Sequence, residues 1–82
     1  MRLDKYLKVA RIIKRRTIAN EACDAGKVEV NGNRARASYE VKVGDKICIR
    51  LGERILNLEV VNISEHVKKE EAINMYKIIG QN

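Results

Sequence analysis

The 82-residue chain contains no proline, phenylalanine or tryptophan, and only three tyrosines. A hydrophobic core must therefore be built from aliphatic side chains, with Tyr6, Tyr39 and Tyr76 as its only aromatic rings. Without phenylalanine or tryptophan, the chain has no large apolar ring to insert into a lipid interface. No apolar run approaches the roughly 20 residues of a membrane-spanning helix. We therefore expect a cytoplasmic protein that does not interact with membranes.

Residue types that usually build catalytic and metal sites are also scarce. His66 is the sole histidine, and its polar neighbours are typical of a solvated surface position. Cys23 and Cys48 lack Cys-x-x-Cys spacing, which predicts buried free thiols in a reducing compartment. No glycine-rich phosphate loop is present. Lysine or carboxylate catalysis stays open, but no pattern indicates it, so we expect a protein that is not an enzyme and has no cofactor or metal.

Positive charge is concentrated at one end of the chain. The net charge is +6, and residues 1–16 account for all of it with seven basic residues and one acidic residue, Asp4. The remaining residues carry ten charges of each sign. This distribution excludes a uniformly basic tail and predicts one local electropositive surface. Its basic residues are Arg2, Lys5, Lys8, Arg11, Lys14, Arg15 and Arg16.

Apolar spacing predicts a first helix over residues 2–13. One face is apolar, and Lys5, Lys8 and Arg11 centre on the opposite face, where we expect no acidic residue at i,i+4 spacing to neutralise them locally. Ile12 falls on this basic face, so the helix should end or bend near it. The apolar face consists of Leu3, Tyr6, Leu7, Ala10 and Ile13.

A basic linker at residues 14–16 precedes a second predicted helix. Thr17 is a suitable N-cap, the helix should run to about Ala25, and Gly26 should close it in the left-handed conformation. The free N–H groups and the positive dipole end of a helix N-terminus favour an anion. We therefore predict that this corner binds phosphate.

Alternating apolar residues predict short strands in the rest of the chain. Asn31-Gly32 is typical of a type I′ hairpin turn. A terminal helix is expected over residues 69–79, ending at Gly80. The predicted strands cover 27–30, 33–37, 46–51 and 54–63, with 39–43 extended. The fold class is α+β: one domain over residues 1–82, with two N-terminal helices packed on a small, mostly antiparallel sheet, plus a C-terminal helix.

Nucleic acid is the polyanion that this charge pattern fits best. RNA is favoured over DNA because the second helix directs Asn20, Glu21 and Asp24 outward, and the two acids would repel phosphates in a major groove. A short helix pair with a basic corner suits recognition of a backbone shape. The alternative is a protein-interaction or ribosome-assembly adaptor whose basic helix meets an acidic partner.

Four blocks follow one another in order over residues 1 to about 50, with a C-terminal hairpin and helix in 51–82. The blocks are Arg2-Leu3-Asp4-Lys5-Tyr6-Leu7, Lys14-Arg15-Arg16-Thr17-Ile18-Ala19, Gly26-Lys27-Val28-Glu29-Val30-Asn31-Gly32 and Val41-Lys42-Val43-Gly44-Asp45. Together they resemble the αL RNA-binding motif of the S4 domain. The chain is most similar to the RqcP and heat-shock protein fifteen family of free-standing members, and it lacks the long basic C-terminal extension of the latter.

The resemblance implies a role in bacterial ribosome-associated quality control. A protein of this kind would bind rRNA and tRNA on a large ribosomal subunit that has stalled and split while it still carries peptidyl-tRNA. It would act with the protein RqcH, which recruits alanyl-tRNA, to support untemplated alanine addition to the nascent chain. We expect it to be a monomer.

The resemblance also assigns RNA contacts to individual positions. Asp4 has a second, equally open interpretation: it could anchor the arginines of the corner, or favour the first helical turn as an acid. Arg15 stands where many family members have serine, so a charged contact would replace a hydroxyl contact. The positions implied by the motif are Arg2, Asp4, Lys14, Arg15 and Arg16, and the basic helix face adds Lys5, Lys8 and Arg11.

Overall fold

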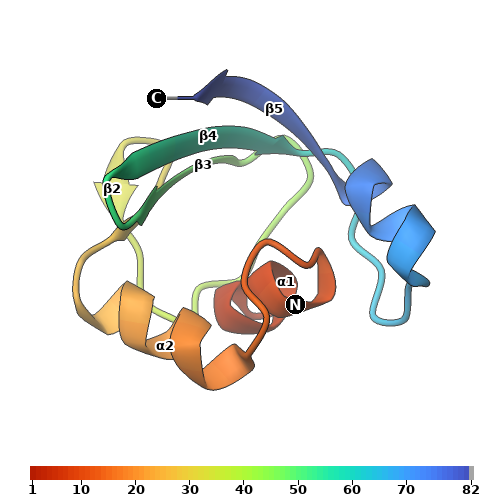
Figure 1. Ribbon diagram of the computed structural model, residues 1–82, viewed down its shortest axis with the longest axis horizontal. Coiled ribbons are helices and arrows are strands. Elements are labelled where there is room, and N and C mark those ends of the chain that lie inside the picture. Colours follow the sequence, from red (N-terminus) through yellow and green to blue (C-terminus); the bar gives the residue numbers. More distant parts are fainter. Residues whose placement is uncertain (82) are drawn as a thin grey trace.

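The fold is a five-stranded antiparallel sheet with two N-terminal helices beneath one face, seen in a computed structural model that describes residues 1–81 (Figure 1). The strand order is β2-β1-β3-β4-β5, which makes β2 and β5 the edge strands. Residue 82, the last of the predicted C-terminal region, lies outside the described residues. The elements are α1 (Leu3–Val9), α2 (Arg16–Asp24), β1 (Val28–Val30), β2 (Asn33–Arg34), β3 (Lys46–Leu51), β4 (Arg54–Val60), the 3-10 helix η1 (Lys69–Met75) and β5 (Tyr76–Gln81).

Helix α1 is shorter than predicted because the chain reverses directly after it. Arg11 has a left-handed backbone (φ 61°), and the N–H groups of Ile12 and Ile13 both donate to the carbonyl of Leu7, at 3.0 and 3.1 Å. The reversal buries Ile13, which is 7% exposed. The predicted bend near Ile12 is therefore confirmed, but Arg11 projects from the turn and not from a helix face.

Helix α2 begins before the predicted cap. Arg15 is extended (φ −123°, ψ 136°), occupies the N-cap position and makes no side-chain capping hydrogen bond. Thr17 lies inside the first turn, so its prediction as the N-cap is wrong. The Ala19 N–H donates to the Arg15 carbonyl, and this hydrogen bond starts the helix two residues earlier than predicted. Gly26 closes the helix with φ 75°, as predicted.

The N-terminal hairpin has the predicted turn and a shorter second strand. Asn31 and Gly32 both have positive φ values, 53° and 85°, as a type I′ turn requires. Strand β2 ends at Arg34, well before residue 37. Beyond this strand, the backbone forms hydrogen bonds with the start of α1: the Asp4 N–H donates to the Ala37 carbonyl at 3.1 Å.

A single aliphatic core lies between the sheet and the two helices. Strand β3 matches its predicted bounds, and β4 ends at Val60 instead of residue 63. No helix within residues 1–81 has the length and apolar character needed to cross a bilayer. The largest fully buried side chains are those of Tyr6, Leu3, Leu7, Ile47, Ile49, Leu58, Met75, Val28, Val60 and Cys23.

The prediction of a terminal helix over residues 69–79 is wrong beyond Met75. Only η1 is helical, and β5 follows it as a strand paired with β4, with Tyr76 opposite Val60. Pairing with β4 satisfies backbone groups on an otherwise open sheet edge. The segment packs on the domain, since Ala72 and Met75 are buried.

One side-chain hydrogen bond ties this C-terminal segment to α1. The buried Tyr6 hydroxyl donates to the Met75 carbonyl at 2.7 Å. Burial, with a smaller effect from Tyr76, raises the pKa of Tyr6, so the hydroxyl keeps its proton. A neutral polar contact inside the core therefore joins α1 to the end of η1.

We predict that Tyr6→Phe lowers the free energy of unfolding by about 1 kcal/mol, the usual contribution of a buried hydrogen bond. Chemical denaturation followed by circular dichroism measures the change. Tyr76→Phe is the matched control, because Tyr76 is only half-buried. Equal losses in both variants would contradict a specific role for the Tyr6 hydroxyl.

Candidate nucleic-acid interface

A buried carboxylate organises the basic N-terminal region. The Asp4 side chain is 3% exposed. Its Oδ1 accepts from Arg2 Nε at 3.2 Å and from the Lys5 backbone N–H at 2.8 Å. Its Oδ2 accepts from Arg2 Nη2 and Asn20 Nδ2, both at 3.3 Å, and pairs with Arg16 Nε at 3.4 Å. Asp4 thus connects α1 to α2 and positions two arginines.

The contacts of Asp4 keep its side chain ionised. Burial opposes ionisation, but hydrogen bonds from Asn20, Arg2 and Arg16 outweigh it and hold the pKa of Asp4 below its ordinary value of 3.8. The geometry favours the anchoring interpretation of Asp4, because its oxygens are already occupied. A direct contact of Asp4 with RNA stays a prediction.

The arginines that Asp4 holds still face solvent. The side chains of Arg2 and Arg16 are 48% and 47% exposed, so each guanidinium retains donors for a ligand. Lys14 and Arg15 are exposed beside them. We call residues 14–16 the basic corner.

The basic corner coincides with the N-terminus of α2. The first N–H groups of this nine-residue helix have no acceptor within the helix, and no side chain caps them. Partial positive charge from these groups adds to the three basic side chains of the corner. An anion at this point would gain from both sources, as the sequence predicts.

The basic face of α1 is partly neutralised by a residue that is distant in sequence. Lys5 Nζ pairs with Glu65 Oε1 at 3.0 Å. This hydrogen bond, together with the charge of Lys5, lowers the pKa of Glu65. The absence of an acidic partner at i,i+4 on the helix therefore does not leave Lys5 unpaired, because a segment 60 residues away in sequence folds back against α1.

Lys8 and Arg11 remain exposed next to that returning segment. They line a shallow groove of about 460 Å³ whose other wall carries His66 and Lys68. His66 is exposed, as predicted. The structure therefore separates the predicted site residues into two groups, with Arg2 and Arg16 joined through Asp4 and the α1 bases beside residues 65–68.

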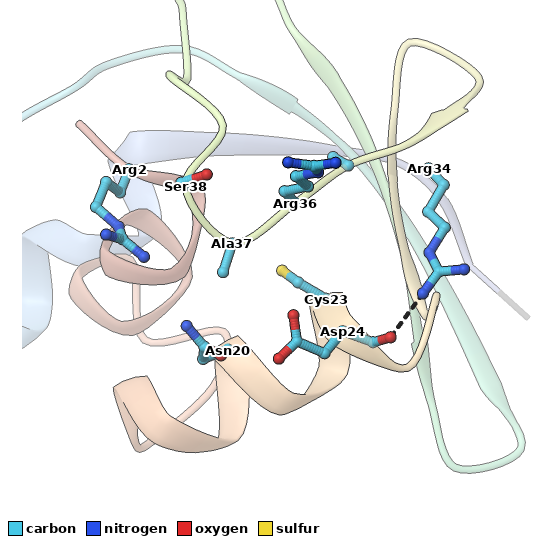
Figure 2. Close-up of a pocket in the computed structure, with 9 residues that line it drawn as sticks. Arg2, Asn20, Cys23, Asp24, Arg34, Arg36, Ala37 and Ser38 are labelled. Atoms are coloured by element: carbon cyan, nitrogen blue, oxygen red, sulfur yellow. Dashed lines mark hydrogen bonds between the residues drawn. The ribbon is translucent and has the colours of Figure 1, made fainter.

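Sequence reasoning missed a second group of arginines. Arg34 and Arg36 line a groove of about 580 Å³ together with Arg2 and residues of α2 (Figure 2). They lie in the part of the chain whose total charge is zero, so a sum of charges conceals them. The sequence feature that could have revealed them is their spacing, because residues two apart in an extended segment point to the same side.

The floor of this groove includes an unreactive thiol. Cys23 is 1% exposed, and burial, together with the charges of Asp4 and Asp24, raises its pKa to about 11. Such a thiol is protonated at neutral pH and is a poor nucleophile. Both cysteines are free, as predicted, but Cys48 is only half-buried, so the prediction of a buried thiol is confirmed for Cys23 and wrong for Cys48.

Comparison with known families agrees with the geometry of this region. The model of the S4 domain matches residues 1–47, which include both helices, β1 and β2. The chain is 51% identical to the RQC P-site tRNA stabilizing factor of Bacillus subtilis, over 99% of this chain and 94% of that protein. It is also 51% identical to the protein of the same name from Streptococcus pneumoniae, over 99% of this chain and 92% of that protein.

A solved structure extends the similarity to the whole fold. Heat Shock Protein 15 of Vibrio cholerae, described as trimeric, superposes with a TM-score of 0.89. The two sequences are 35% identical, and the match covers 95% of this chain and 80% of that one. The similarity in fold therefore extends over nearly the whole chain.

We predict that Asp4→Asn lowers the free energy of unfolding at neutral pH by about 2 kcal/mol, because charge-assisted hydrogen bonds to both arginines are weakened. The folded pKa is depressed, so the stabilisation by the Asp4 charge is complete above 3.8 and is lost as the pH falls through the lower folded value. Denaturation curves across this pH range should show the two proteins converging below pH 3.8.

The control for this prediction is Asp24→Asn, which removes an exposed acid from the same helix pair. Its effect on stability should stay within about 0.5 kcal/mol. A stability gap for Asp4→Asn that does not depend on pH would contradict the ionic role of Asp4.

Proposed function

The chain belongs to the S4 domain family, and from this premise we propose that it is an RNA-binding factor of bacterial ribosome-associated quality control. It acts in the cytoplasm on the split large ribosomal subunit that still carries peptidyl-tRNA. It contacts rRNA and tRNA, and it has no catalytic activity of its own.

This proposal rests mainly on one observation: Arg2 and Arg16 both pair with the buried Asp4, and Arg16 lies at the start of α2. The network fixes two exposed guanidinium groups beside free helix N–H groups. Such an arrangement fits the phosphates of a folded RNA backbone better than the edges of bases. The tRNA in the name of the Bacillus subtilis relative agrees with this ligand.

The protein would act by holding the tRNA in position relative to the rRNA. A protein that holds rRNA on one side and a tRNA on the other restricts how the tRNA can move, and restricted motion lowers the entropic cost of the next reaction. With RqcH delivering alanyl-tRNA, the result would be alanine addition to the nascent chain. In this mechanism the protein supplies orientation only, and the chemistry belongs to the ribosome.

We propose that the protein works as a monomer. The trimer described for the Vibrio cholerae relative is the alternative. Light scattering after size-exclusion chromatography distinguishes the two by mass.

The proposal predicts that the double variant Arg15→Glu/Arg16→Glu no longer co-sediments with large ribosomal subunits, while its circular dichroism spectrum is retained. The physical reason is charge reversal at the point where phosphates would bind. For wild-type protein, about six neutralised phosphates correspond to a slope of about −4 to −5 in a plot of log affinity against log salt. Unchanged sedimentation of the variant would overturn the proposal.

Two further variants make this test specific. Lys14→Glu/Arg15→Glu leaves the Asp4 network intact and should also lose binding. Arg50→Glu/Arg54→Glu changes the net charge equally at exposed positions of β3 and β4, and it should bind like wild type. If Lys14→Glu/Arg15→Glu and Arg50→Glu/Arg54→Glu weaken binding to the ribosomal subunit equally, the effect is one of general charge. If the protein instead binds an acidic protein partner and shows no salt-dependent affinity for RNA, the adaptor alternative is favoured.

A further inference from the structure

The groove beside α2 is lined by three arginines that come from two segments of the chain. Arg2 precedes α1, Arg34 ends β2, and Arg36 follows in the extended chain. Figure 2 shows Arg2 and Ser38 at one end, Arg34 at the other and Arg36 between them, with α2 forming the opposite wall. Among the residues that the structure describes, Asp24 is the one acid that lines the groove.

Arg34 has a structural role as well as a charge. Its Nη2 donates to the Asp24 carbonyl, at 2.6 Å, at the C-terminal end of α2. Its guanidinium also lies across Gly26, where an added Cβ would come within 3.2 Å of Arg34 Cζ. A neutral carbonyl accepts this hydrogen bond, so the positive charge of Arg34 is positioned without being neutralised.

Arg36 is the least restrained of the three. It is exposed, and among residues 1–80 its side chain makes no hydrogen bond and no ion pair within 4 Å. On either side of it, Ala35 and Ala37 are buried, at 7% and 5% exposure. These two anchors hold the backbone, so the Arg36 side chain extends from a fixed point while its guanidinium stays free to bind a ligand.

The groove is continuous with the Asp4 network. Asn20 lines it, and Asn20 also lines the smaller depression next to Arg16 and Thr17 at the start of α2. Arg2 lines the groove while its guanidinium is held by Asp4, the same carboxylate that holds Arg16. A polyanion that binds at the basic corner therefore reaches Arg36 past Asn20, and the exposed acids along that path are Glu21 in the depression and Asp24 in the groove.

We propose that this groove binds the RNA backbone beyond the basic corner, with Arg36 contacting a phosphate and Arg34 and Arg2 supplying positive charge on either side. The inference rests on the proposed function, because the phosphate belongs to the same RNA. Arginine suits the role, since its guanidinium offers two parallel donors to a phosphate. The groove thereby lengthens the RNA footprint from the helix pair to the β-hairpin.

The test measures binding of labelled protein to purified large ribosomal subunits carrying tRNA, over a range of salt concentrations. Arg36→Gln should weaken binding about fivefold to tenfold and reduce the salt slope by about 1, the loss of one phosphate contact. Arg36→Lys, which keeps the charge, should restore most of the slope. Arg54→Gln is the matched control, since Arg54 is exposed at the β3–β4 turn and should bind like wild type.

The outcomes separate this inference from the function on which it rests. If Arg15→Glu/Arg16→Glu abolishes binding while Arg36→Gln matches Arg54→Gln, the groove is not part of the interface and only this inference fails. If wild-type protein shows no salt-dependent binding, both the inference and the proposed function fail. Weaker binding by Arg36→Gln but not by Arg54→Gln, with the melting temperature of Arg36→Gln unchanged, supports the groove.

Discussion

The ionised carboxylate of Asp4, buried between two helices, is the constraint on which the interface depends. A buried charge is costly unless hydrogen bonds and opposite charges surround it. Arg2, Arg16 and Asn20 meet that requirement from both sides of the α1–α2 contact. The need to satisfy one acid therefore fixes where two cations stand, and both remain about half exposed toward solvent.

The surrounding surface follows from this arrangement. The start of α2 adds free N–H groups beside the basic corner, and Asn20 continues the polar surface into the arginine groove. On the other side of α1, the pair between Lys5 and Glu65 ties the returning C-terminal segment to the helix. The domain thus keeps its exposed positive charge on elements whose backbones are held by the core, which lowers the entropic cost of binding a polyanion.

Local sequence patterns predicted most of the helices, strands and turns, and they failed where contacts with distant segments decide the structure. The Asn31-Gly32 turn, the Gly26 closure and β3 depend on neighbouring residues alone, and all three are confirmed. Residues 76–79 have apolar spacing that suits a helix, but the open edge of β4 recruits them as a strand. Thr17 has the chemistry of an N-cap, yet Arg15 takes that position. Lys5 acquires its partner from a segment 60 residues away, which helix spacing cannot reveal.

By itself, the sequence determined the α+β class, the location of the excess positive charge and the similarity to the αL motif, because composition, periodicity and ordered blocks are properties of the chain alone. Only the tertiary structure decided which of those charges are free. It buried Asp4 among arginines, neutralised Lys5 and gathered Arg2, Arg34 and Arg36 around one groove. The physical reason is that electrostatic interactions depend on distance and burial, and the fold sets both.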